Sequence, residues 1–128
     1  MRLDNMSDLD RIGRLIVDAA YTVHKALGPG LLESIYEACF CHELGKRGLR
    51  VRRQVEPPLI YDGLRFDNGL VLDVLVDDLV ICELKAREPH PVFVAQLLSQ
   101  LRLAEKRLGY LINFHVPLMK QGVRRLIL

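Results

Sequence analysis

The sequence predicts an α/β fold of the α+β type, in which a mixed β-sheet is flanked by helices. Three observations lead to this prediction. Two stretches in the N-terminal third have apolar residues at helical spacing, the middle of the chain alternates or runs apolar as strands do, and a third helical stretch divides the later strands. The predicted order of elements is therefore ααβββαββ.

The first two helices are separated by a glycine–proline–glycine sequence. Apolar residues recur every three or four positions over residues 7–27. Gly28 and Pro29 then end the helix, because glycine accepts the left-handed cap and proline cannot continue a helix. The second helix is predicted to start just after Gly30 and to run to about Gly45.

Three strands follow. Residues 49–63 alternate in character and contain Pro57 and Pro58, which force a bulge or a break. Residues 69–76 and 79–86 are almost continuously apolar, which predicts a hairpin covered on both faces.

A third helix and two further strands complete the pattern. The helix is predicted over residues 92–108, followed by a buried strand at 109–114 and a short edge strand at 123–128. The packing stripe expected for the helix consists of Val94, Leu97, Leu98, Leu101 and Ala104.

Composition limits the class of protein. The chain has 128 residues with no linker or repeat, so we expect residues 1–128 to form one domain. No apolar run is long enough to span a bilayer, and the polar N-terminus shows no signal-peptide pattern, so a cytoplasmic location is expected. Three cysteines without ligand spacing predict buried thiols and no zinc site.

The charge distribution says less about partners. The net charge is only +2, although five cations fall within residues 46–53 and two more at 124–125. Such runs are more often solvated edges than phosphate tracks.

Two charges on a buried strand are the informative feature. Glu83 and Lys85 share one face, because side chains alternate along a strand. A two-residue turn in the preceding hairpin would pair Asp73 with Cys82 and leave Glu83 on the other side. A three-residue loop, or one bulged residue, would set Asp73 opposite Glu83. We favour this second register, because the first buries unpartnered carboxylates.

In that register the residues favour a metal site. Asp73 and Glu83 would repel each other without a cation, and Mg²⁺ is often held by one or two carboxylates. The carbonyl of Leu84 is a further candidate ligand. Lys85 would hold an attacking water or neutralise charge on a phosphoryl oxygen. The alternative is a structural ion pair between Lys85 and one of the acids.

Two more polar residues are candidates for the same site. Glu33 lies in the first turn of the second helix, where an acid also interacts favourably with the helix N-terminus. Gln96 is expected on the buried side of the third helix, where its amide would orient a water or a phosphate.

The sequence also resembles a known family. "DVLVDDLVICELKA" is similar to the core of the PD-(D/E)xK nuclease superfamily, with Asp73 followed after a hairpin by Glu83-Leu84-Lys85. Within it, "GPGLLESIY" supplies Gly30, Glu33 and Tyr36 in the spacing of the GxxExxY family, and "AQLLSQLRLAEKRLGYLINF" and "GVRRLIL" are similar to that family's closing segments. The resemblance covers roughly residues 10–128.

The resemblance implies a restriction-endonuclease-like core that carries a metal-dependent active site. Asp73 and Glu83 would hold Mg²⁺, for which Mn²⁺ would substitute, and Lys85 would stabilise the attack. Glu33 and Gln96 match polar helix residues of the superfamily. Gln100 departs from the pattern, because an aromatic residue is expected there.

Two functions therefore remain open at this stage. The first is a Mg²⁺-dependent nuclease that hydrolyses phosphodiester bonds of DNA or RNA. The second is a catalytically weak nucleic-acid- or protein-binding module that retains the nuclease core. In either case no membrane is involved, and the edge strand at 123–128 leaves a homodimer possible.

Overall fold

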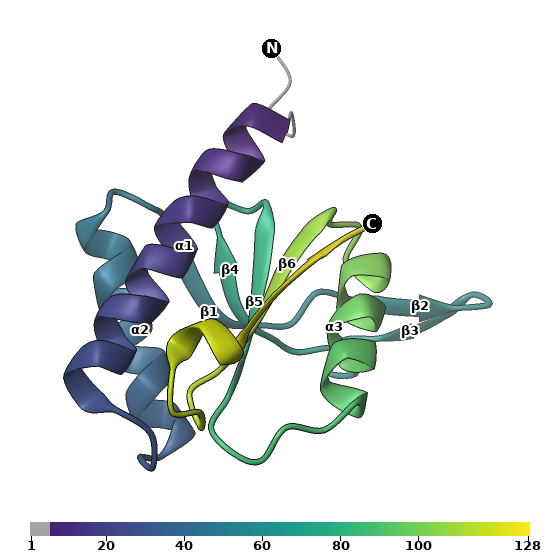
Figure 1. The fold of residues 1–128 in the computed structure, drawn as a ribbon. Coiled ribbons are helices and arrows are strands. Elements are labelled where there is room, and N and C mark those ends of the chain that lie inside the picture. Colours follow the sequence, from purple (N-terminus) through teal and green to yellow (C-terminus); the bar gives the residue numbers. More distant parts are fainter. Residues whose placement is uncertain (1–5) are drawn as a thin grey trace.

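A five-stranded mixed sheet with helices on both faces forms the body of the computed structural model, which describes residues 6–128 (Figure 1). The first residues of the polar N-terminal stretch, 1–5, lie outside the described residues. The strands of the sheet stand in the order β1-β4-β5-β6-β7. Their bounds are Val51–Val55 (β1), Leu72–Val76 (β4), Val80–Lys85 (β5), Leu108–Asn113 (β6) and Val123–Ile127 (β7).

The helices divide between the two faces of the sheet (Figure 1). α1 (Met6–Leu27) and α2 (Glu33–Lys46) pack on one face with Val74 and Val76 of β4 and the even-numbered side chains of β5 and β6. α3 (Val92–Leu103) covers the other face and packs on odd-numbered side chains such as Ile81 and Leu111. The central strands are therefore buried from both sides, as their continuous apolar runs predict.

Only β5 and β6 run parallel, and α3 is the connection between them. The remaining neighbours in the sheet pair antiparallel. A short 3₁₀ helix, Met119–Gln121, precedes the edge strand β7. The predicted fold class, a mixed sheet flanked by helices, is confirmed.

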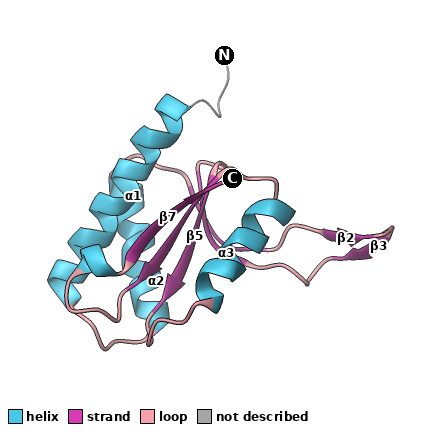
Figure 2. Ribbon diagram, turned by 45° about the vertical axis from the view of Figure 1, so that its right-hand side comes forward, coloured by secondary structure: helices cyan, strands magenta, loops and turns pink. Residues whose placement is uncertain are grey.

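Two parts of the predicted order need correction. Residues 49–63 do not form one interrupted strand, because β2 (Leu59–Tyr61) and β3 (Leu64–Phe66) form a separate hairpin that projects from the body (Figure 2). Asp62 and Gly63 connect these strands with φ values of 49° and 82°. An Asp-Gly pair with both φ values positive is typical of a two-residue hairpin turn, and this signal was present in the sequence.

The third helix ends at Leu103 and not near residue 108. Glu105 adopts the left-handed conformation, with a φ of 57°. The amide of Lys106 donates to the carbonyl of Leu101 at 2.9 Å, and that of Glu105 to the carbonyl of Arg102 at 3.4 Å. These two bonds form a Schellman cap without glycine, and they release the chain into β6.

No helix among residues 6–128 is both long and apolar enough to cross a membrane.

Candidate active site

The connection between β4 and β5 decides whether Asp73 and Glu83 share a face. Val74 pairs with Cys82, so the connection consists of three residues, 77–79. The ladder ends at this pair, and Asp73, the next residue of β4, lies beside Glu83, with its carboxylate on the amide of Leu84. The prediction of a three-residue or bulged connection is confirmed.

Two aspartates make this connection without glycine. Asp77 and Asp78 have φ values of 51° and 57°, in the left-handed region that aspartate tolerates better than most residues. The amide of Leu79 donates to the carbonyl of Val76 at 2.9 Å and closes the turn. The neighbouring strand fixes it further, because the Asp77 carboxylate accepts a 2.8 Å hydrogen bond from the amide of Arg50.

Lys85 and the two carboxyl groups form a buried polar cluster. The Nζ atom of Lys85 lies 3.3 Å from Oε2 of Glu83, and both side chains are at most 10% exposed. Asp73 is close enough to Glu83 for their carboxyl groups to share a hydrogen bond. Three charged groups thus meet at the end of the β4–β5 ladder, in an otherwise apolar sheet.

The backbone of Leu84 lies against the same cluster. Its amide donates to Oδ2 of Asp73 at 3.0 Å. The N–H and C=O groups of one residue point to the same side of an extended strand, so the carbonyl of Leu84 is also directed toward Asp73. The ladder between β4 and β5 ends at Val74 and Cys82, and this carbonyl lies just beyond it.

Burial dominates the electrostatics of the cluster. Desolvation, followed by the charge of Asp73, raises the pKa of Glu83 to about 7, against the hydrogen bond from Gln100 and the charge of Lys85. Burial also raises the pKa of Asp73, and the hydrogen bond from the Leu84 amide opposes that shift. Near neutral pH the pair of acids therefore readily holds a proton.

We expect the metal-free protein to lose stability as the pH rises from 5.5 to 7. The pKa of Glu83 is about 7 in the folded state against an ordinary value of 4.5 for this side chain, so over this interval the folded state retains a proton that the unfolded state has released. Stability then falls with rising pH. At about 1.36 kcal/mol per pH unit, this carboxyl alone lowers the free energy of unfolding by about 2 kcal/mol.

Urea unfolding in EDTA at the two pH values measures this loss. The matched control is Glu83→Gln, which keeps the shape of the side chain and has no proton to release. A loss of equal size in both proteins would contradict the assignment to Glu83.

The start of α2 brings Glu33 toward the cluster. The backbone of Ala86 lies close to the Glu33 carboxylate. Burial, followed by the charge of Asp73, raises the pKa of Glu33, while Lys85 and Arg87 oppose the shift. Glu33 therefore lies within electrostatic reach of the residues with which the sequence groups it.

The turn before α2 positions Glu33. Gly30 has a φ of 106°, a conformation that side chains other than glycine's rarely permit. The hydroxyl of Tyr36 donates to the carbonyl of Gly28 and accepts from the amide of Leu31. The Gly-x-x-Glu-x-x-Tyr spacing thus fixes where the helix begins, and with it the place of Glu33.

Glu37 is a neighbour of the site that the sequence analysis missed. Its carboxylate accepts hydrogen bonds from Arg53 and from Gln54, each at 2.9 Å. Its charge also contributes to the raised pKa of Asp73. Glu37 lies one helical turn after Glu33, on the same side of α2, and that spacing was the available signal.

Of the two glutamines of α3, Gln100 and not Gln96 contacts the cluster. Gln96 is exposed, so its predicted position on the buried side of the helix is wrong. Gln100 is buried instead, and its Nε2 atom donates to Oε1 of Glu83 at 3.1 Å. Gln96 lies one turn before Gln100 and one turn after Phe93, and the Phe93 ring is 4.7 Å from Nζ of Lys85.

The donor set fits a hard cation that keeps some of its water. Within residues 6–128, no three His, Cys, Asp or Glu side chains are arranged to hold a metal ion by themselves. Asp73 and Glu83 nevertheless supply two carboxylates, and the carbonyl of Leu84 lies beside them. Mg²⁺ commonly takes one or two protein carboxylates and completes its shell with water or substrate oxygens.

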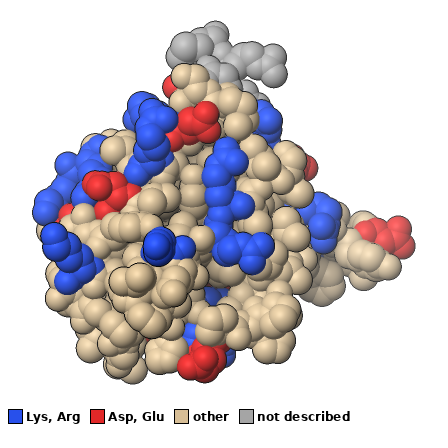
Figure 3. Space-filling view, in the orientation of Figure 1, with Lys and Arg blue, Asp and Glu red and all other residues tan. Residues whose placement is uncertain are grey.

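Basic side chains are mostly paired within the fold. Among residues 46–53, the cations with acidic partners are Lys46, Arg47, Arg50, Arg52 and Arg53. On the face drawn in Figure 3, Lys and Arg side chains lie over the edge strand β7 and over the helices, with acidic side chains between them. This pattern agrees with a solvated edge at 46–53 and leaves β7 as the more open basic segment.

A comparison with protein families gives a family for a chain with this mixed sheet and this cluster of charged residues. The model of the PD-(D/E)XK nuclease superfamily matches residues 10–126. The chain therefore belongs to the PD-(D/E)XK nuclease superfamily. Nucleases of this superfamily generally use divalent metal ions and act on nucleic acid. Neither the curated proteins nor the solved structures that were compared include a match.

Proposed function

We propose that this protein is a Mg²⁺-dependent nuclease that hydrolyses phosphodiester bonds of DNA or RNA, with Mn²⁺ able to replace Mg²⁺. The observation that supports the proposal is the meeting of Asp73, Glu83 and Lys85 just past the end of the β4–β5 ladder. A structural ion pair alone would not need a second buried carboxyl group. Perturbed acids of this kind gather at functional sites.

In this proposal Asp73, Glu83 and the carbonyl of Leu84 hold the ion. When bound, Mg²⁺ would supply charge stabilisation and an activated water. Lys85 neutralises charge that develops on the phosphoryl oxygen. Glu33 adds negative charge at the rim of the same cluster.

The amide side chains of α3 have different roles in this proposal. Gln100 holds Glu83 in place through its 3.1 Å hydrogen bond. Gln96, which is exposed one turn before Gln100, would contact the substrate and orient a water or a phosphate.

Further features of the proposal concern the whole chain. The Gly30, Glu33 and Tyr36 spacing supports membership of the GxxExxY family within the superfamily. We also propose that residues 1–128 act as one nuclease-like domain in the cytoplasm. The edge strand β7 is open for pairing with a second copy, so a homodimer is compatible with the fold.

The test is metal-dependent cleavage. We expect the purified protein to nick plasmid DNA, or to cut a single-stranded DNA or RNA, in Mg²⁺ or Mn²⁺, and to lose this activity completely in EDTA. Asp73→Asn should lose the activity together with the calorimetric signal of Mn²⁺ binding, because a neutral amide is a poorer ligand for a hard cation. Asp67→Asn, on an exposed loop beside β3, is the matched control. Cleavage that persists in EDTA would refute metal dependence.

One observation favours a second candidate, a binding module with little hydrolysis. Both oxygens of Glu83 already have protein donors, with Gln100 on Oε1 and Lys85 on Oε2. An ion would have to compete with these donors. Salt-sensitive binding of an oligonucleotide in EDTA, without cleavage when Mg²⁺ or Mn²⁺ is added, would support this candidate over the nuclease.

A further inference from the structure

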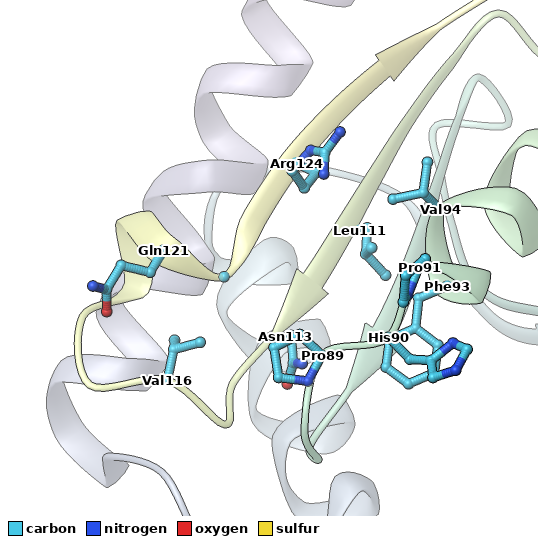
Figure 4. A pocket seen from close by; sticks show the side chains of 11 residues that line it. Pro89, His90, Pro91, Phe93, Val94, Leu111, Asn113, Val116, Gln121 and Arg124 are labelled. Atoms are coloured by element: carbon cyan, nitrogen blue, oxygen red, sulfur yellow. The ribbon is translucent and has the colours of Figure 1, made fainter.

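A cleft opens beside the candidate active site, on the face of the sheet that α3 covers. Its volume is about 520 Å³, and it lies between the segment that leads into α3, the end of β6 and the start of β7 (Figure 4). This volume falls in the usual range for pockets that bind small molecules or parts of them. Phe93, Val94 and Leu111 supply apolar surface, while the rings of Pro89, His90 and Pro91 lie at one end.

The ring of Phe93 separates this cleft from the catalytic candidates. Phe93 lines the cleft, and Nζ of Lys85 lies 4.7 Å from the centre of its ring. The guanidinium of Arg87 lies 4.8 Å from the same ring. A group bound in the cleft would therefore be separated from Lys85 by the ring of Phe93.

Arg124 gives the cleft its charge. It pairs with Leu111 across the β6–β7 ladder, which directs both side chains to the same face. Arg124 has no ion pair among residues 6–128, whereas the neighbouring Arg125 lies 3.4 Å from Asp10 on the opposite face. No Asp or Glu is among the described residues that line the cleft. The cleft therefore combines apolar walls with one unpaired cation, which suits a base attached to a phosphate.

Other polar groups of the cleft are already engaged by the protein. Asn113 donates to the carbonyl of Arg87 at 2.7 Å and accepts from the amide of His115 at 3.0 Å. Nδ1 of His90 accepts from the amide of Val92 at 3.0 Å. These bonds hold the loops that form the walls. The exposed face of the His90 ring remains available for stacking. The engaged groups do not offer a set of hydrogen-bond donors and acceptors that would select one particular base.

We propose that this cleft binds one unstacked base of a single-stranded nucleic acid, with a neighbouring phosphate on Arg124 and the next phosphodiester directed toward Lys85. The inference rests on the proposed function and adds the substrate class. A base inside a duplex is stacked on its neighbours and cannot enter such a cleft without being flipped out. Stacking on aromatic and apolar surface tolerates any base, so single strands of DNA and RNA are both candidates.

The test measures binding in EDTA, so that it does not depend on hydrolysis. Fluorescence anisotropy compares a single-stranded oligonucleotide, as DNA and as RNA, with a base-free deoxyribose-phosphate strand of equal length and charge. We expect the wild-type protein to bind at least one of the intact strands roughly tenfold more tightly than the base-free strand, because stacking one base contributes about a tenfold factor or more. Equal affinity for intact and base-free strands, or a preference for duplex, would overturn the proposal.

Two pairs of variants locate the effect. Val94→Trp, which fills the cleft, should abolish the preference for intact strands, whereas Leu103→Trp, at an exposed position near the end of α3, should keep it. Arg124→Ala should weaken binding and reduce the slope of log affinity against log salt by about one, and Arg125→Ala should leave that slope unchanged. Since Arg124 is exposed, this pair remains informative if Val94→Trp does not fold.

The outcomes separate this proposal from the proposed function. Base-dependent binding without cleavage in Mg²⁺ or Mn²⁺ would refute the nuclease and support the cleft. Metal-dependent cleavage by a protein that binds base-free strands equally well would support the nuclease and refute the cleft. A preference for intact strands that survives Val94→Trp, or a salt slope that Arg124→Ala leaves unchanged, would also refute the cleft as described.

Discussion

Replacement of Lys85 by alanine is expected to lower metal-dependent cleavage by a factor of about 10² to 10³. The Lys85 ammonium group lies 3.3 Å from Glu83 in a site that excludes most water. A fixed charge in such a site stabilises a transition state more strongly than the same charge in water, and loss of one such group typically costs about 3–4 kcal/mol in the barrier. Initial rates at saturating Mn²⁺ measure the effect.

Two controls make the result specific to the position of the charge. Lys106→Ala removes a lysine that donates to the carbonyl of Asp78 at the opposite end of β5, and its rate should remain close to that of the wild type. Lys85→Arg keeps the charge but not the geometry, so its activity should fall as well. Cleavage by Lys85→Ala at the wild-type rate would rule out the assigned role, and equal losses in Lys106→Ala would point to a general effect of charge on substrate binding.

The register of the central hairpin shows how much of the candidate site could be predicted from the sequence. Asp73 lies beside Glu83 only if the loop has a third residue or a bulge, and the loop contains no glycine to indicate either. Asp77 and Asp78 tolerate the left-handed conformation without requiring it. The contact that fixes Asp77 comes from Arg50 on another strand. Sequence reasoning could therefore favour this register from the cost of buried acids, but the local pattern alone could not fix it.

The glutamines of α3 show where a prediction from helical periodicity failed. Adjacent helical positions are about 100° apart, so a small error in the assumed phase exchanges buried and exposed residues. The predicted stripe began at Val94 and left out Phe93, which is buried and packs with Leu97 and Leu101. With Phe93 included, Gln100 faces Glu83, and Gln96, one turn earlier, lies at the exposed edge of the buried stripe. The identity of the helix was readable from its periodicity, whereas its phase depended on the sheet beneath it.

Glu37 was missed for a related reason. Nothing in α2 distinguishes it from a surface acid, and its partners Arg53 and Gln54 are supplied by β1. Gln54 also has a φ of 51°, which is unusual for a residue within a strand. Its position next to the residue that pairs with Val74 brings this unusual backbone close to Asp73. Such convergence of two elements is a tertiary property that spacing along the chain does not encode.

The second large effect is expected for Phe114→Ala, which should lower the free energy of unfolding by about 3–5 kcal/mol. Phe114 is fully buried and its ring stacks on that of Tyr36, with the ring centres 4.5 Å apart and the planes within 5°. Truncation removes this contact and leaves a cavity where α2 meets the end of β6. Because a domain of this size has about 5–15 kcal/mol of stability, the variant would lose a large share of it.

Urea unfolding in EDTA measures the loss. Phe66→Ala is the matched control, since that phenylalanine is 45% exposed on the β2–β3 hairpin and its truncation should cost less than about 1 kcal/mol.

The stack also bears on the active site, because Tyr36 anchors the start of α2 near Glu33, and the amide of Phe114 donates to the carbonyl of Lys85 at 2.9 Å. The fraction of the Phe114→Ala protein that remains folded should therefore bind Mn²⁺ more weakly than the wild type does. A variant that lost less than about 1 kcal/mol would show that this stack does not hold α2 to the sheet, and the placement of Glu33 would then need another cause.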